Sequence, residues 1–103
     1  MTTTSLGAAT VLYARAASDA LVQKQLASLY EAAERNHHMR VIDTCCDVGA
    51  RPSALLKLLD RIETGQADVD LIVVECQTRV RRAFNRELME RLEAMGIAII
   101  AFR

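Results

Sequence analysis

Arginines are the residues of this sequence whose type and spacing suggest chemistry. Arg79, Arg81 and Arg82 fall within four positions, shortly after the apolar run 69–74. That run is typical of a strand covered on both faces, and open α/β sheets keep their ligand sites at the carboxyl ends of such strands. One guanidinium group can donate two hydrogen bonds to two oxygens of a phosphate or carboxylate. The pattern therefore favours an anion site. The alternative interpretation is that these arginines are solvated at the start of a helix, although a positive charge there interacts unfavourably with the helix dipole.

Two further arginines follow other predicted strands. Arg15 ends the first predicted strand, 8–15, and Arg51 lies in the loop 47–52 after the second. The turn after the first strand reads AASDA and has no glycine that would let the backbone approach a pyrophosphate. Dinucleotide binding is therefore poorly supported, and we expect no cofactor.

The histidines and cysteines do not predict a metal site. His37 and His38 are neighbours with no third ligand at a helpful spacing, so we expect them in a solvated turn. The cysteines are Cys45, Cys46 and Cys76, an odd number without the Cys-x-x-Cys spacing of zinc sites. They indicate reduced thiols that pack as small apolar groups.

The overall charge gives no sign of a large nucleic-acid surface. Thirteen Lys and Arg residues balance 13 Asp and Glu residues in a chain of 103 residues, so any site for a polyanion must be local. No apolar run is long enough to span a membrane, and the first residues lack the pattern of a signal peptide. We expect a cytoplasmic protein that does not contact membranes.

Strand and helix patterns alternate along the chain. Residues 1–7 are predicted to be a flexible tail, and 8–103 a single domain. In the first helix, which Ser18 or Asp19 would cap, apolar residues recur at helical spacing. Strands are predicted at 8–15, 39–46, 69–74 and 97–102, and helices at 19–35, 53–64 and 82–95.

The last helix has a clear inner and outer face. Apolar residues recur at 84, 88, 92 and 95, which predicts the buried face. On the other face, Arg86 with Glu90 and Glu87 with Arg91 are each four residues apart, the spacing of ion pairs on a solvated surface.

The alternation predicts a three-layer α/β fold with a mostly parallel four-stranded sheet. The predicted strand order is 2-1-3-4, with the first and last helices of the series on different faces. In that order the first and third strands are neighbours, and a switch point opens between Arg15 and Glu75. Arg15 would then face the segment 78–82.

Six stretches together resemble a known family. They are YARAAS at 13–18, QLASLYEAAERN at 25–36, DVGARP at 47–52 with LLKLLDRI behind it, VDLIVV at 69–74, RVRR at 79–82 and LMERLEAMGIAII at 88–100. In this order they are similar to the N-terminal catalytic domain of serine recombinases, the resolvase and invertase family, in a degenerate and truncated form. The resemblance covers about residues 11–102 and implies the resolvase-like fold.

In that family a serine two residues after the first-strand arginine attacks a DNA phosphodiester, and nearby arginines stabilise the phosphate. Here the resemblance places Ala17 at the nucleophile position, with Ser18 one residue further. Thr78 stands where the family has an aspartate, and Arg81 where it has a glycine. The resemblance implies phosphate binding by Arg15, Arg51, Arg79 and Arg82, with Gln25, Asp47 and Thr78 in support.

The sequence leaves more than one function open. The favoured hypothesis is a resolvase-like domain that has lost DNA strand cleavage and acts as a DNA-associated or protein-interaction module. Its partners would be the DNA phosphate backbone, another protein, or a second copy in a homodimer. The alternative is an active recombinase domain that uses Ser18 as nucleophile with a separate DNA-binding partner, since the family's dimerisation helix and DNA-binding domain would lie outside this chain. A ligand-responsive module with the same fold is a third hypothesis.

Overall fold

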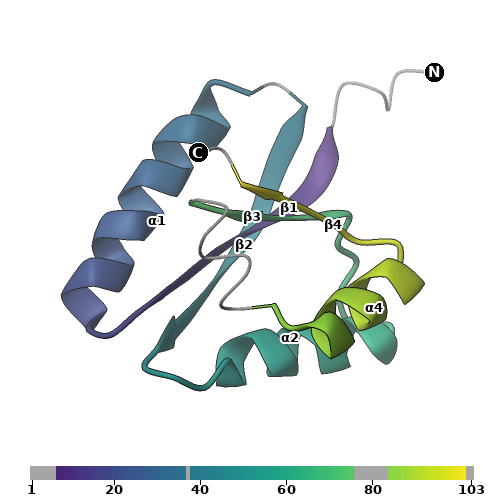
Figure 1. Ribbon diagram of the computed structural model, residues 1–103. Helices are drawn as coiled ribbons and strands as arrows, with labels where there is room; N and C mark the ends of the chain where they lie inside the picture. The colour runs from purple at the N-terminus through teal and green to yellow at the C-terminus, as the bar shows by residue number, and fades with distance from the viewer. Residues whose placement is uncertain (1–6, 37, 76–83, 102–103) are drawn as a thin grey trace.

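The structure is a computed structural model that describes residues 7–36, 38–75 and 84–101. Strands and helices alternate, as the sequence predicts, and the four strands form one parallel sheet in the order β2-β1-β3-β4. Figure 1 shows α1 on one face of this sheet and α2 and α4 on the other. The predicted three-layer α/β architecture is confirmed. The elements are β1 (Ala8–Ala16), α1 (Asp19–Glu34), β2 (Met39–Val48), α2 (Ser53–Glu63), β3 (Leu71–Val74), α4 (Arg86–Ala94) and β4 (Ala98–Ala101).

The central strand β1 contributes to both apolar layers. Its side chains alternate, so Val11 and Tyr13 pack with α2 and α4, while Leu12 and Ala14 pack with α1. All four residues of β3 are buried as well. These two strands carry the core because each has a strand on either side and a helix layer on either face.

Helix α1 packs through the predicted stripe. Its buried residues include Val22, Leu26, Leu29 and Ala33, and also the polar Gln25. Ser18 caps the helix, as predicted, since its Oγ accepts a hydrogen bond of 3.3 Å from the Leu21 backbone N–H. The start of α1 is therefore fixed by the residue directly after Ala17.

The sequence predicts that the last helix begins at about residue 82 and includes Phe84. This is wrong for Phe84, which lies outside α4. Asn85 is the N-cap of α4, with Oδ1 accepting a 2.9 Å hydrogen bond from the Leu88 N–H, so Phe84 lies before the helix. Phe84 is nevertheless buried in the same core as Leu88 and Leu92. The apolar pattern identified the right residues, but the cap decided where the helix starts.

The prediction of two ion pairs along α4 is correct for one pair and wrong for the other. Arg86 does pair with Glu90, at 3.5 Å. Arg91, however, binds across to α2 rather than to Glu87: its Nη2 lies 2.7 Å from Asp60 Oδ1 and its Nε lies 2.5 Å from Glu63 Oε1. Because α4 packs against α2, Arg91 can bind two carboxylates at once. Two charge-assisted hydrogen bonds are more favourable than the single one that Glu87 would provide.

The expectation that the second strand lies at an edge of the sheet is confirmed, and the strand runs on to Val48. Its register with β1 shifts at Ile42, since Thr10 lies opposite Val41 but Val11 lies opposite Asp43. Among the described residues, no helix is both long enough and apolar enough to cross a membrane.

Candidate functional site

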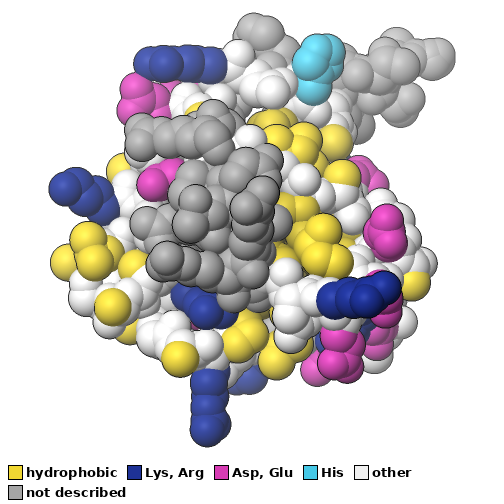
Figure 2. Space-filling model, viewed as in Figure 1, with side chains coloured by type: hydrophobic (Ala, Val, Ile, Leu, Met, Phe, Trp, Pro, Cys, Tyr) yellow, Lys and Arg dark blue, Asp and Glu magenta, His cyan; other side chains and the backbone are white. Residues whose placement is uncertain are grey.

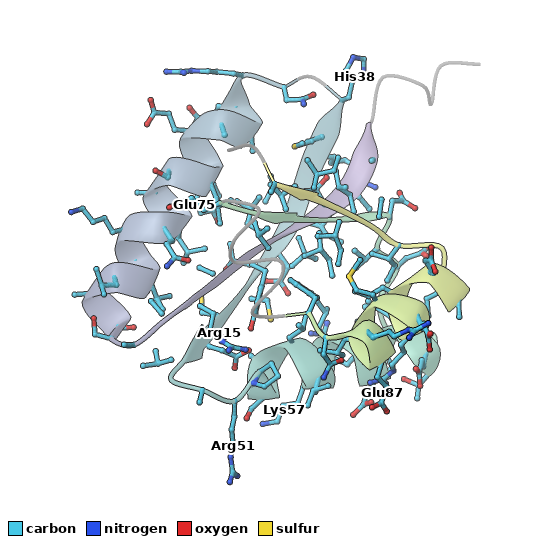
Figure 3. The ribbon with its side chains drawn as sticks, viewed as in Figure 1. Arg15, His38, Arg51, Lys57, Glu75 and Glu87 are labelled. Atoms are coloured by element: carbon cyan, nitrogen blue, oxygen red, sulfur yellow. The ribbon has the colours of Figure 1, made fainter. Side chains whose placement is uncertain are left out.

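Arg15 lies at the carboxyl end of the central strand, on the side of the sheet that α2 and α4 cover. It follows Val11 and Tyr13 at alternate positions of β1 and is opposite Asp47 in the register with β2. Its positive charge acts on the Tyr13 hydroxyl, where it opposes a larger rise in the pKa caused by burial and by Asp47. Figure 3 shows Arg15 beside the start of α2.

Gln25 fixes the backbone at Arg15. Its side chain is 4% exposed, and its amide makes two hydrogen bonds to the same residue. The Arg15 N–H donates to Gln25 Oε1 at 3.3 Å, and Gln25 Nε2 donates to the Arg15 carbonyl at 3.1 Å. Helix α1 thus holds the backbone of β1 at Arg15, while a supporting role of Gln25 in phosphate binding stays a prediction.

Asp47 is a buried carboxylate, 5% exposed, at the end of β2. Its Oδ1 accepts a hydrogen bond from the Ala54 N–H at 2.6 Å, and its Oδ2 accepts from the Leu55 N–H at 3.2 Å and from the Tyr13 hydroxyl at 2.8 Å. Pro52, the N-cap residue of α2, makes no side-chain capping bond. Asp47 therefore satisfies two of the N–H groups at the start of α2 from outside the helix.

Ser18 lies in the turn after β1, at the start of the helix that covers the face opposite α2 and α4. Its Oγ is engaged with the first turn of α1, which covers the opposite face, and the next residue is the acidic Asp19. Ala17 and Ser18 are both exposed. The exposed turn therefore presents a methyl group at the matched position and a hydroxyl that caps a helix.

Arg51 lies in the connection between β2 and α2. Gly49 turns this connection over the end of β1: its φ is +97°, and its N–H donates to the Ala16 carbonyl at 2.8 Å. Arg51 is exposed, and Figure 3 shows its side chain extending away from the body of the molecule. Arg15 and Arg51 thus lie at one edge of the sheet, but their side chains take different directions.

The remaining predicted site residues, Thr78, Arg79 and Arg82, lie outside the described residues. On the face shown in Figure 2, the Lys and Arg side chains that are described stand apart rather than forming one basic patch. Within the described ranges, no group of three or more His, Cys, Asp or Glu residues is arranged to hold a metal ion. His38 is exposed in a turn after α1.

Neither Arg15 nor Ser18 lines either of two grooves on the surface of the described residues. One, of about 390 Å³, lies between α1 and β2 and is lined by Tyr30, Met39 and Val41 among others. The second, of about 290 Å³, lies between α2 and α4 beside Leu56 and Arg91. Neither groove brings together the residues that the sequence predicts for a site.

Sequence reasoning missed the hydrogen-bond partners of the site. The signal for Gln25 was present, because a polar residue beside Val22 and Leu26 on a buried stripe needs a partner. Tyr13 and Asp47 gave a weaker signal, since only the register of the strands shows that they face the same layer.

Comparison with solved structures gives a consistent fold. The C-terminal catalytic domain of ISC1926 TnpA, an IS607-like serine recombinase, is 24% identical with a TM-score of 0.71, over 91% of this chain and 69% of that one. The first open reading frame of transposon ISC1904 from Sulfolobus solfataricus is 22% identical with a TM-score of 0.70, over 93% and 68% of the two chains.

A serine recombinase from Sulfolobus solfataricus gives a third match, 24% identical with a TM-score of 0.67, over 92% of this chain and 70% of that one. No protein-family model and no curated protein sequence matches the chain. The predicted likeness to serine recombinase catalytic domains is therefore confirmed for the fold.

Proposed function

We propose that this chain is a resolvase-like domain that binds the DNA phosphate backbone through arginines at the carboxyl edge of its sheet and no longer cleaves DNA strands. The observation that carries the proposal is which residues stand at two adjacent positions, Ala17 and Ser18. The position that matches the recombinase nucleophile has no hydroxyl, and the hydroxyl of the next residue caps α1.

Three features of Ser18 support the loss of cleavage. Its Oγ already accepts the Leu21 N–H, Asp19 adds a negative charge beside it, and its helix covers the face opposite the Arg15 side chain. A nucleophile needs an adjacent base and cationic groups near the phosphate that it attacks. The surroundings of Ser18 supply a helix cap instead.

Binding without cleavage requires only the arginines. Gln25 holds the backbone of Arg15 through two hydrogen bonds, and Arg51 is exposed at the same edge of the sheet. Arg79 and Arg82 complete the set that the resemblance implies. Since the net charge of the chain is zero, we infer that such a local cluster dominates binding to the DNA backbone. The proposal has the domain in the cytoplasm, with a protein partner or a second copy as a further interaction.

The test is the salt dependence of binding to a labelled DNA duplex, measured by fluorescence anisotropy. Arg15→Gln, Arg51→Gln, Arg79→Ala and Arg82→Ala are each expected to weaken binding and to reduce the slope of log K against log salt by about 0.9. Arg35→Gln is the control, since Arg35 pairs with Glu31 at the far end of α1. Slopes that match the unaltered protein in all four variants would contradict the proposal.

Strand cleavage by Ser18 is the second candidate, and the fold likeness to serine recombinase catalytic domains favours it. A nicked suicide substrate traps any phosphoseryl intermediate as a protein–DNA adduct. The proposal predicts no adduct. An adduct that forms with the unaltered protein and with Ser53→Ala, but not with Ser18→Ala, would replace binding by catalysis. Ser53 is a fair control because it is exposed at the first position of α2.

A further inference from the structure

One buried side chain, Tyr13, contacts two segments that come from distant parts of the chain. Its hydroxyl donates a 2.8 Å hydrogen bond to Asp47 Oδ2. Its ring meets the ring of Phe84 edge to face, with 5.8 Å between the centroids and 70° between the planes. Tyr13 is 2% exposed, so water does not compete for either contact.

The hydroxyl contact continues into the start of α2. Asp47 also accepts hydrogen bonds from the Ala54 and Leu55 N–H groups. Tyr13, Asp47 and the first turn of α2 therefore form one chain of hydrogen bonds. Arg51 lies in the short connection that these bonds enclose. Arg15 lies two residues after Tyr13 on the same face of β1.

We propose that Tyr13 is a positioning residue for phosphate binding, which rests on the function proposed above. Through Asp47, its hydroxyl holds the start of α2 against the end of β1, and this sets the placement of Arg51 relative to Arg15. The two side chains take different directions, so each would contact its own phosphate, and they act together on one DNA backbone most effectively when the backbone positions that carry them are fixed before binding. Tyr13 does this without touching the phosphate.

The variant Tyr13→Phe isolates the hydroxyl. It keeps the ring on Phe84, and Asp47 keeps the Ala54 and Leu55 N–H groups, so the fold is retained. The affinity that is lost is expected to match the typical net contribution of one hydrogen bond, which is about fivefold in Kd. Tyr30→Phe is the matched control: it removes the same hydroxyl from a side chain that is 45% exposed on α1.

The decisive measurement is a double-mutant cycle on the full chain, with Arg15→Gln and Arg51→Gln, alone and together, and a labelled DNA duplex as probe. In the unaltered protein and in Tyr30→Phe, the effects of the two arginine substitutions are expected to be non-additive. In Tyr13→Phe they are expected to become additive. A general loss of stability lowers the amount of folded protein but leaves the coupling between the arginines unchanged.

Asp47→Asn is a second variant, because an amide also fits between the hydroxyl and the helix but exchanges one acceptor for a donor. We expect it to abolish the coupling as Tyr13→Phe does. Coupling that persists in both variants, or that is absent from the unaltered protein, would overturn the positioning role while leaving DNA binding intact. Absence of salt-dependent binding by the unaltered protein would instead overturn the proposed function, and this inference with it.

Discussion

Gln25 and Arg15 are joined by two hydrogen bonds that use both polar groups of the Arg15 backbone. The N–H donates to Gln25 Oε1, and the carbonyl accepts from Gln25 Nε2. Arg15 is near the last position of β1, where a strand end otherwise exposes such groups to water. A side chain of α1 therefore holds the backbone of β1 at Arg15, one residue before the strand ends.

Replacing Gln25 by leucine is expected to destabilise the fold by about 1 to 3 kcal/mol, because two partly buried backbone groups lose the hydrogen bonds that Gln25 supplies. Urea unfolding followed by circular dichroism measures this loss. Gln23→Leu, an exposed substitution on the same helix, is the control and is expected to change the stability little. Equal losses for the two variants would contradict this role of the Gln25 side chain.

Ser18 is expected to contribute to stability as a helix cap. Ser18→Ala removes the acceptor for the Leu21 N–H and should cost about 1 kcal/mol, whereas Ser18→Asp should retain most of the stability because aspartate also caps helices. Thermal or urea unfolding of the three proteins checks this. An equal loss for the alanine and aspartate variants would show that the serine oxygen does not cap α1.

Asp47→Ala is expected to cost more than most single substitutions on the surface. It leaves the Tyr13 hydroxyl and the Ala54 and Leu55 N–H groups without their acceptor, at a cost of about 2 to 3 kcal/mol. Hydrogen exchange should locate the effect at Ala54 and Leu55. Asp43→Ala is the control, since Asp43 is exposed on the same strand and accepts only a local bond from the Thr44 N–H.

The pairing of Glu63 with Arg91 predicts a dependence of stability on pH. The hydrogen bond from Arg91 lowers the pKa of the Glu63 carboxyl below its ordinary value. A carboxyl with a lowered pKa in the folded state stabilises the fold above its unfolded pKa, and the stabilisation is lost as the pH falls through the folded value.

Glu63→Gln should therefore lower the Tm slightly at neutral pH and have no effect in strong acid, where both proteins lack the charge. Melting curves across this pH range provide the measurement. Glu87→Gln is the control, because Glu87 lies on α4 but does not bind Arg91. A difference between Glu63→Gln and the unaltered protein that stays constant with pH would rule out the ion pair as its cause.

Cys45 is expected to resist alkylation at neutral pH. Burial, and then the negative charge of Asp47, raises the pKa of its thiol to about 12, so the reactive thiolate is scarce. Cys46, which is only partly buried, should react before Cys45, although burial also raises its pKa. Iodoacetamide labelling with peptide mass spectrometry, in native buffer and in urea, checks the order. Equal labelling of Cys45 and Cys46 in native buffer would contradict it.

The sequence was sufficient to predict the fold because its patterns are local. The apolar stripe of α1 and the β-branched run of β3 each lie within one element, and the parallel order follows from the handedness of the connections. Glycines at the ends of α2 and α4, Gly65 and Gly96, adopt the positive φ that closes a helix.

The site was less predictable because its contacts are not local. Asp47 caps a helix that begins beyond a turn, and Arg91 reaches carboxylates 28 and 31 residues away. Such partners follow from how elements pack, which no periodicity encodes. Arg15 was placed correctly at the end of β1, whereas the cooperation of Arg79, Arg82 and Thr78 with it stays a prediction.

β1 precedes β2 and β3 in the sequence and lies between them in the sheet, and this shapes how the protein folds during synthesis. β1 pairs with β2 and with β3, and the hydrogen bond from the Ala9 N–H to Asp70 Oδ2 spans 61 residues. β1 leaves the ribosome before either of its neighbours, so β1, α1 and β2 are expected to assemble as an early unit with one side of β1 unprotected. The nascent chain is then most prone to aggregate before Leu71 emerges.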